Sequence, residues 1–162
     1  MAQLKGLVFD MDGTLVDNLA YHFAAFEEYA KREGFELLEP VTLKHNGMHL
    51  KDIFPILFGE KVVEEHTLEK LTIGKESMYR EMYRPHIAPI AGLIELLQAA
   101  KEAGVKCAIG SSGCRENVEM IIEALGIADK WETPLGKLSF GQQQRVALIR
   151  ALCQPFDFIF LD

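Results

Sequence analysis

Residues 7–17 read LVFDMDGTLVD, and this stretch decides the fold. The apolar run LVF ends at Asp10, and Gly13 follows three residues later. A short apolar run bounded by an acid and a glycine predicts a buried strand of the parallel type followed by a tight loop. Asp10 and Asp12, at positions i and i+2, would then face one point at the strand tip, while Gly13 lets the backbone bend sharply.

Further along the chain, helical and strand patterns alternate. Residues 19–84 are dominated by helical patterns, the first of which ends at Gly34, and they predict an all-helical insert. Residues 105–113, VKCAIGSSG, predict a second strand that ends in small polar side chains. Strands that alternate with helices indicate a parallel sheet with right-handed crossovers, in which ligands gather at the carboxyl ends of the strands. We therefore expect an α/β protein with its site at that edge.

Length and composition limit the number of domains and the kinds of partner that we expect. A chain of 162 residues fits one domain, or a core with an inserted lobe. We expect an α/β core from residues 1–16 and 85–162, with a helical cap inserted at residues 17–84. The net charge of -7, with no long basic run, argues against a nucleic-acid partner.

Location and redox state follow from two further patterns. Asp10 and Asp12 interrupt the first apolar run, so it predicts neither a signal sequence nor a membrane partner. The three cysteines have no metal-ligand spacing and are too scattered for a disulfide framework, which favours a cytoplasmic protein.

The paired carboxylates predict one of three roles. They suit metal binding, or a division of labour in which one Asp attacks and the other transfers protons. A carboxylate that attacks phosphorus needs a divalent cation, because two anions must be brought together. An acidic pair also occurs in ordinary strand-to-loop turns, so a purely structural role stays open.

The longer string FDMDGTLVD resembles motif I of the haloacid dehalogenase superfamily, and AIGSSG resembles its motif II. The resemblance covers residues 4–127 and is nearest to the β-phosphoglucomutase-like phosphatases and mutases. It implies a Rossmann-like three-layer parallel-sheet core, truncated here, with an inserted helical cap. The implied activity is Mg2+-dependent phosphoryl transfer through an aspartyl phosphate, with a small phosphorylated metabolite such as a sugar phosphate as substrate.

The same resemblance implies a role for each matching residue. Asp10 would be the nucleophile, Asp12 the general acid and base, and Ser111 a hydrogen-bond donor to the phosphoryl group. Gly13 and Ser112 would bind substrate. Asp10 and the backbone carbonyl of Asp12 would hold Mg2+.

Two histidines of the expected cap are further candidates for substrate binding. His22 matches a cap-hinge histidine of the sugar-phosphate mutases, although a histidine on an amphipathic helix is also a common packing residue. His49 lies in HNGMHL, a cap loop that would face the substrate. Leu50 falls where the mutases carry a substrate-phosphate arginine, and this departure favours a phosphatase over a mutase.

The last stretch, residues 137–162, has a different resemblance. LSFGQQQRVALIRAL, followed by FDFIFLD, resembles the signature and Walker B segments of ABC-transporter ATPases, and the change falls near residues 123–127. An ABC ATPase needs a GxxxxGK[ST] loop to cradle ATP, and residues 1–162 contain none. An ATPase fragment is therefore the weakest functional hypothesis.

Residues 137–162 could nevertheless complete the site that Asp10, Asp12 and Ser111 begin. Lys137 would neutralise the Asp10 and phosphate charges, and Asp162, at the end of a last strand, would complete the Mg2+ shell. Alternatively Lys137 points into water and Asp162 frays at the chain end. The strand before Asp162 would also leave an open sheet edge, which predicts a homodimer.

Two main hypotheses of function result. The first is a phosphatase or phosphomutase with weak turnover, carried by Asp10, Asp12 and Ser111. The second is a chimera of dehalogenase and ABC fragments that folds without catalytic activity.

Overall fold

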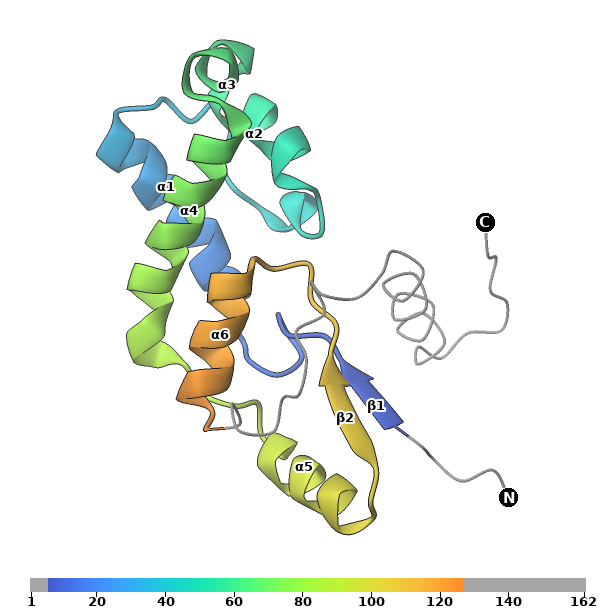
Figure 1. Ribbon diagram of the computed structural model, residues 1–162. Coiled ribbons are helices and arrows are strands. Elements are labelled where there is room, and N and C mark those ends of the chain that lie inside the picture. Colours follow the sequence, from blue (N-terminus) through green and yellow to red (C-terminus); the bar gives the residue numbers. More distant parts are fainter. Residues whose placement is uncertain (1–5, 127–162) are drawn as a thin grey trace, which may run out of the picture. The chain divides into compact units, whose positions relative to one another are not determined.

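The computed structural model describes residues 6–126, and these form two compact units (Figure 1). The first, which we call the α/β unit, comprises residues 6–17 and 88–126. The second, the helical unit, comprises residues 18–87. Residues 137–162, with Lys137 and Asp162, lie outside the described part of the chain.

Two parallel strands, β1 (Gly6–Phe9) and β2 (Lys106–Ile109), form the described sheet of the α/β unit. Phe9 pairs with Ile109, so both strands end at the same edge (Figure 1). The helix α5 (Leu93–Glu102) leads into β2 and packs on it, and α6 (Arg115–Ala124) follows it. The parallel pairing predicted from the sequence is confirmed.

The core of the α/β unit is continuous with the loop that follows β1. Met11, Leu15 and Val16 are at most 1% exposed, because their side chains turn inward from the loop. The backbone N–H of Ile90 donates to the Leu15 carbonyl at 3.0 Å, which ties the chain's return from the helical unit to this loop. Burial of these apolar side chains fixes the loop's shape, and the polar side chains between them follow that shape.

The helical unit contains four α-helices and two short 3-10 helices. Its first helix ends at Gly34, whose φ of 75° is in the left-handed region, as the sequence predicts for a glycine stop. The first and last α-helices pack against each other along the unit. In chain order the elements are α1 (Leu19–Glu33), η1 (Leu43–His45), α2 (Leu50–Phe58), α3 (Glu60–His66), α4 (Leu68–Tyr83) and η2 (Arg84–His86).

Aromatic rings form much of the helical unit's core. Phe26 of α1 meets Phe54 of α2 edge to face with ring centroids 5.9 Å apart, and Phe54 stacks on Phe58 at 5.6 Å. All three rings are at most 4% exposed. Aromatic pairs at these separations stabilise a core beyond the effect of buried area alone. Among the helices within residues 6–126, none has the length and apolarity that a membrane crossing requires.

Gly74 of α4 makes the close approach of α4 to α1 sterically possible. A Cβ atom at this position would overlap the ring of Tyr29, 2.5 Å from its hydroxyl oxygen, and Tyr29 is only 7% exposed. We expect Gly74→Ala to destabilise the protein by about 1–3 kcal/mol through overpacking. Without that clash, the change would stabilise a helix by about 0.5–1 kcal/mol.

The opposing signs make this substitution a test of the α1 and α4 packing. Urea denaturation gives the free energy of unfolding of the parent chain, of Gly74→Ala and of the double variant Gly74→Ala with Tyr29→Leu. The double variant should be more stable than Gly74→Ala alone, because leucine at position 29 leaves free the space that the added methyl group needs. A more stable Gly74→Ala variant would contradict the packing described above.

Candidate functional site

The loop after β1 presents two carboxylates on the opposite side from its buried side chains. Asp10 and Asp12 are both partly exposed, while Met11 between them is fully buried. The backbone N–H of Met11 donates to Oδ1 of Asp10 at 3.0 Å. The N–H groups of Leu15 and Gly13 donate to the carbonyls of Met11 (2.9 Å) and Val16 (2.8 Å), which closes a tight turn.

Gly13 gives this turn its curvature. Its φ of 73° lies in the left-handed region, where a side chain is strained. Gly13 is exposed, so its backbone is accessible beside the two carboxylates. This is the sharp bend that the sequence predicts after the acidic pair.

The loop after β2 meets the loop after β1. The N–H of Gly110 donates to the Phe9 carbonyl at 2.8 Å, which continues the strand pairing to the edge of the sheet. Beyond it, Ser111 Oγ accepts a 2.9 Å hydrogen bond from the N–H of Gly113. This bond turns the serine hydroxyl back over its own loop.

Gly113, in the loop after β2, lies close to side chains of the loop after β1. A methyl group at Gly113 would be 3.1 Å from Ser111 Oγ, 3.2 Å from Met11 Cε and 3.9 Å from Asp12 Oδ2. The serine hydroxyl and the Asp12 carboxylate therefore border the same small space, which a Cβ atom at position 113 would partly fill. Gly113 was not among the predicted site residues; its place in the small polar run after β2 was the available signal.

The α6 helix begins directly after this loop. Cys114 is its N-cap residue, and its carbonyl accepts from the N–H of Asn117 at 3.1 Å. The first N–H groups of a helix, together with its dipole, favour an anion at this end. The site thus combines two carboxylates, a hydroxyl and a helix N-terminus at the carboxyl ends of neighbouring parallel strands.

The types of oxygen atom at this edge of the sheet are suitable ligands for Mg2+. Carboxylate and backbone carbonyl oxygens are the ligands that Mg2+ prefers, and Asp10 and Asp12 supply both types. No cluster of three or more His, Cys, Asp or Glu residues suited to a metal occurs within the described residues. Asp162, the third predicted ligand, lies outside them.

His22 lies in the helical unit and contacts a buried cluster whose members are not predictable from sequence periodicity. Its ring stacks on Tyr79 with centroids 3.8 Å apart, and its Nδ1 is 2.9 Å from Nζ of Lys75. The Lys75 side chain is 3% exposed and also donates to Glu76 Oε1 at 2.9 Å. An ammonium group can only donate hydrogen bonds, so His22 Nδ1 is the acceptor. The ammonium also lies 4.8 Å from the ring centre of Phe26.

His49, the second histidine candidate, is exposed immediately before α2. Its backbone carbonyl accepts from the N–H groups of Asp52 (2.9 Å) and Ile53 (3.1 Å), which starts the helix. The ring therefore projects from a fixed point in the backbone. His22 and His49 both belong to the helical unit, whereas Asp10 and Ser111 belong to the α/β unit.

Cys107 of β2 is not a reactive group of this site. Burial raises the pKa of its thiol, so the side chain stays protonated near neutral pH. Because the thiolate is the reactive form of cysteine, we expect the Cys107 side chain to be a poor nucleophile.

A parallel α/β unit with an acidic pair at the tip of its first strand, and a helical unit inserted after it, defines a class of capped α/β proteins. The chain belongs to the haloacid dehalogenase-like hydrolases, whose family model matches residues 7–144. This match extends past residue 127, where the resemblance was expected to end, and includes Lys137. The family and fold class predicted from the sequence are confirmed.

Two relatives illustrate the family likeness. The pyrophosphatase PpaX of Oceanobacillus iheyensis is 26% identical over 130 residues, which cover 80% of this chain and 58% of that protein. The crystal structure of β-phosphoglucomutase from Clostridium difficile superimposes with a TM-score of 0.67 at 21% identity, covering 93% of this chain and 70% of that one. At this identity, the likeness to β-phosphoglucomutase shows a shared fold alone.

A short segment also matches ABC-transporter proteins. An ABC transporter ATP-binding protein of Haemophilus influenzae is 49% identical over 47 residues, which cover 29% of this chain and 20% of that protein. Resemblance to this second family is thus confirmed for a short segment. The chain spans less than two thirds of the length of either curated relative described here.

Proposed function

We propose that the chain transfers phosphoryl groups from small phosphorylated metabolites through an aspartyl phosphate on Asp10, acting as a phosphatase or phosphomutase. The observation that carries this proposal is the shared space beside Gly113, bordered by the Asp12 carboxylate and the Ser111 hydroxyl. Asp10 directly precedes this turn at the end of β1, where a phosphoryl group could reach it. Family membership supports the same chemistry.

Each residue has a distinct role in the proposed reaction. A carboxylate oxygen of Asp10 attacks phosphorus, and the bond from phosphorus to the leaving oxygen breaks. Asp12 gives its proton to the leaving oxygen, and later takes a proton from the water that hydrolyses the aspartyl phosphate. Ser111 donates its hydroxyl hydrogen to a phosphoryl oxygen.

Charge neutralisation completes the proposed site. Asp10 and the Asp12 carbonyl would hold Mg2+, which when bound offsets the repulsion between the attacking carboxylate and the phosphate. The backbone N–H groups and the dipole at the N-terminus of α6 would also stabilise the negative charge of the phosphoryl group that is transferred. Lys137 and Asp162 are the remaining proposed contributors, and they lie outside the described residues.

Four further residues are proposed to bind substrate, and each is described within its own unit. Gly13 and Ser112, which are exposed beside the acidic pair, would contact the phosphoryl group. His22 and His49 of the helical unit are the other residues proposed to bind substrate. Leu50, in place of an arginine, favours hydrolysis over mutase chemistry.

A second hypothesis is a chimera that folds without turnover. It is favoured by the match of a short segment to ABC-transporter proteins. If Lys137 and Asp162 come from that second ancestry, they must still reach the site within about 0.5 Å of the productive geometry. We therefore expect turnover slower than that of a natural phosphatase.

Hydrolysis of acetyl phosphate and p-nitrophenyl phosphate, measured as phosphate release with and without Mg2+, tests the proposal. Release that requires Mg2+ supports phosphoryl transfer at the acidic pair. A folded chain that releases no phosphate from either compound would support the chimera instead.

A further inference from the structure

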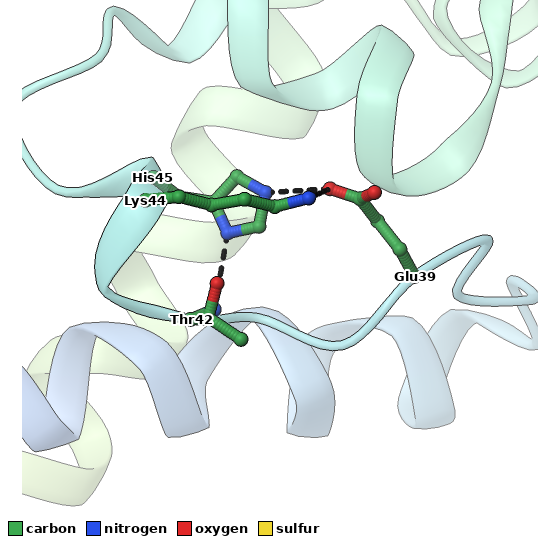
Figure 2. Close-up of polar contacts among 4 residues, drawn as sticks. All are labelled: Glu39, Thr42, Lys44 and His45. Carbon is green, nitrogen blue, oxygen red and sulfur yellow. Dashed lines mark hydrogen bonds and ion pairs between the residues drawn. The ribbon is translucent and has the colours of Figure 1, made fainter.

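The buried side chain of His45 holds one turn of the helical unit together (Figure 2). Its Nε2 lies 2.8 Å from Oε1 of Glu39, and its Nδ1 accepts the backbone N–H of Thr42 at 3.0 Å. Nζ of Lys44 reaches the same Glu39 oxygen at 2.7 Å. These contacts all join residues 39–45, so the cluster stabilises its own turn.

Met11 of the α/β unit is also buried, but its contacts connect two separate segments of the chain. Its backbone is fixed within the loop after β1. The Met11 carbonyl accepts from the N–H groups of Thr14 (3.3 Å), Leu15 (2.9 Å) and Val16 (3.4 Å). Its own N–H donates to Oδ1 of Asp10 at 3.0 Å. The Met11 side chain therefore extends into the core from a fixed point of the backbone.

The far end of the Met11 side chain lies against the loop after β2. A Cβ atom added to Gly113 would be 3.2 Å from Met11 Cε, so the terminal methyl group is in contact with this glycine. Gly113 is also the residue whose N–H donates to Ser111 Oγ at 2.9 Å. Asp12 Oδ2 lies 3.9 Å from the same Cβ position. Met11 thus contacts the residue that orients the serine hydroxyl beside the Asp12 carboxylate.

A methionine is well suited to connect the two loops. Its side chain is unbranched and long, so it fills an irregular gap between packed segments. Because interiors are close-packed, neighbouring atoms shift when such a group is lost. Without the terminal methyl group, the loop at Gly113 would lose support on its buried side. The Ser111 hydroxyl could then move relative to the Asp12 carboxylate.

We propose that Met11 is a positioning residue, whose terminal methyl group supports Gly113 and so sets the distance between the Ser111 hydroxyl and the Asp12 carboxylate around the phosphoryl group. All four residues belong to the α/β unit. This inference rests on the proposed function, which assigns the hydroxyl and the carboxylate to the reaction. It deepens that function by naming the side chain that couples the two loops. The buried Met11 side chain itself touches no substrate.

Three substitutions separate this role from a contribution to stability alone. Met11→Leu keeps an apolar side chain of similar volume but lacks the atom that reaches Gly113. Gly113→Ala adds a methyl group between Met11 Cε (3.2 Å) and Ser111 Oγ (3.1 Å). The φ of Gly113 is not positive, so alanine there has no left-handed strain. Met120→Leu makes the matched change at another buried position of the α/β unit, in α6, and is the control.

Steady-state hydrolysis of p-nitrophenyl phosphate in Mg2+ tests the positioning role. In Met11→Leu and in Gly113→Ala we expect kcat to fall about tenfold with KM changed less than about twofold, because contacts made in the transition state are displaced. Met120→Leu should stay within about twofold of the parent in both constants. A kcat of Met11→Leu that equals that of Met120→Leu would overturn the positioning role.

The double variant Met11→Leu with Gly113→Ala tests the contact itself. Substitutions of residues in contact are not additive, and here the alanine methyl group takes the place that Cε leaves. We therefore expect a kcat above that of either single variant. A kcat no higher than that of the better single variant would overturn the inference. Gly113→Ala leaves Met11 in place, so a parental kcat in this variant would overturn it as well, even where Met11→Leu gives no cooperative melt.

Nuclear magnetic resonance tests the Met11 contact without any turnover. The parent should show a nuclear Overhauser effect between the ε-methyl group of Met11 and the α protons of Gly113. A folded parent without this effect would overturn the inference. A parent that neither hydrolyses p-nitrophenyl phosphate nor melts at a higher temperature with Mg2+ and beryllium fluoride would overturn the proposed function, and the positioning role with it. The Overhauser effect would still decide whether Met11 supports Gly113.

Discussion

Asn in place of Asp10 should abolish phosphate-ester hydrolysis, lowering kcat by about a thousandfold or more. The amide retains the size of the carboxylate and can still accept a hydrogen bond from Met11, whose N–H is 3.0 Å from Asp10 Oδ1. It cannot attack phosphorus as an anion, so no aspartyl phosphate forms. Steady-state phosphate release from p-nitrophenyl phosphate in Mg2+ measures the loss.

Asp17→Asn is the matched control for this experiment. Asp17 belongs to the same sequence motif, is exposed, and has no role in the proposed reaction. Its kcat should stay within about twofold of the parent value, as is usual for a solvated side chain outside the chemistry. If Asp10→Asn retains the parent's kcat while Asp17→Asn does not, the nucleophile has been misassigned.

Asn in place of Asp12 should have the second large effect. For an alkyl phosphate, whose leaving group must be protonated, we expect kcat to fall by about 10²–10⁴-fold. The first step with acetyl phosphate should suffer much less, because its leaving group departs without a proton. The aspartyl phosphate should then accumulate, since Asp12 is also the base for its hydrolysis.

Mass spectrometry of the intact protein after an acid quench detects this accumulation. Asp12→Asn treated with acetyl phosphate and Mg2+ should gain the mass of one phosphoryl group, and the double variant with Asp10→Asn should gain none. Unchanged hydrolysis of an alkyl phosphate by Asp12→Asn would remove Asp12 from the role of acid and base.

The elements near the acidic pair could be predicted because local pattern and topology agree there. An apolar run ending at Asp10 gave β1, and a second run ending at Ser111 gave β2. Parallel strands end at one edge, so their following loops had to approach each other. In the structure Ser111 and Asp12 do approach each other beside Gly113.

The helical unit's polar clusters could not be predicted in this way. Lys75 and Glu76 are adjacent in sequence, whereas helical periodicity pairs residues three or four positions apart. His45 lies in a polar stretch typical of an exposed loop, and only the packed fold reveals that its ring is buried between Glu39 and Thr42. Tertiary packing, which sequence periodicity does not encode, decided both cases.

The most direct test of the central claim is a thermal melt of the chain with Mg2+ and beryllium fluoride, a mimic of the aspartyl phosphate. A ligand that binds only the folded state raises the melting temperature, by an amount that grows with the ratio of its concentration to its dissociation constant. We predict a cooperative melt that beryllium fluoride with Mg2+ shifts upward in the parent and leaves unmoved in Asp10→Asn. A cooperative melt that is unmoved in the parent, or shifted equally in both, would contradict the assignment of Asp10 as the phosphoryl acceptor.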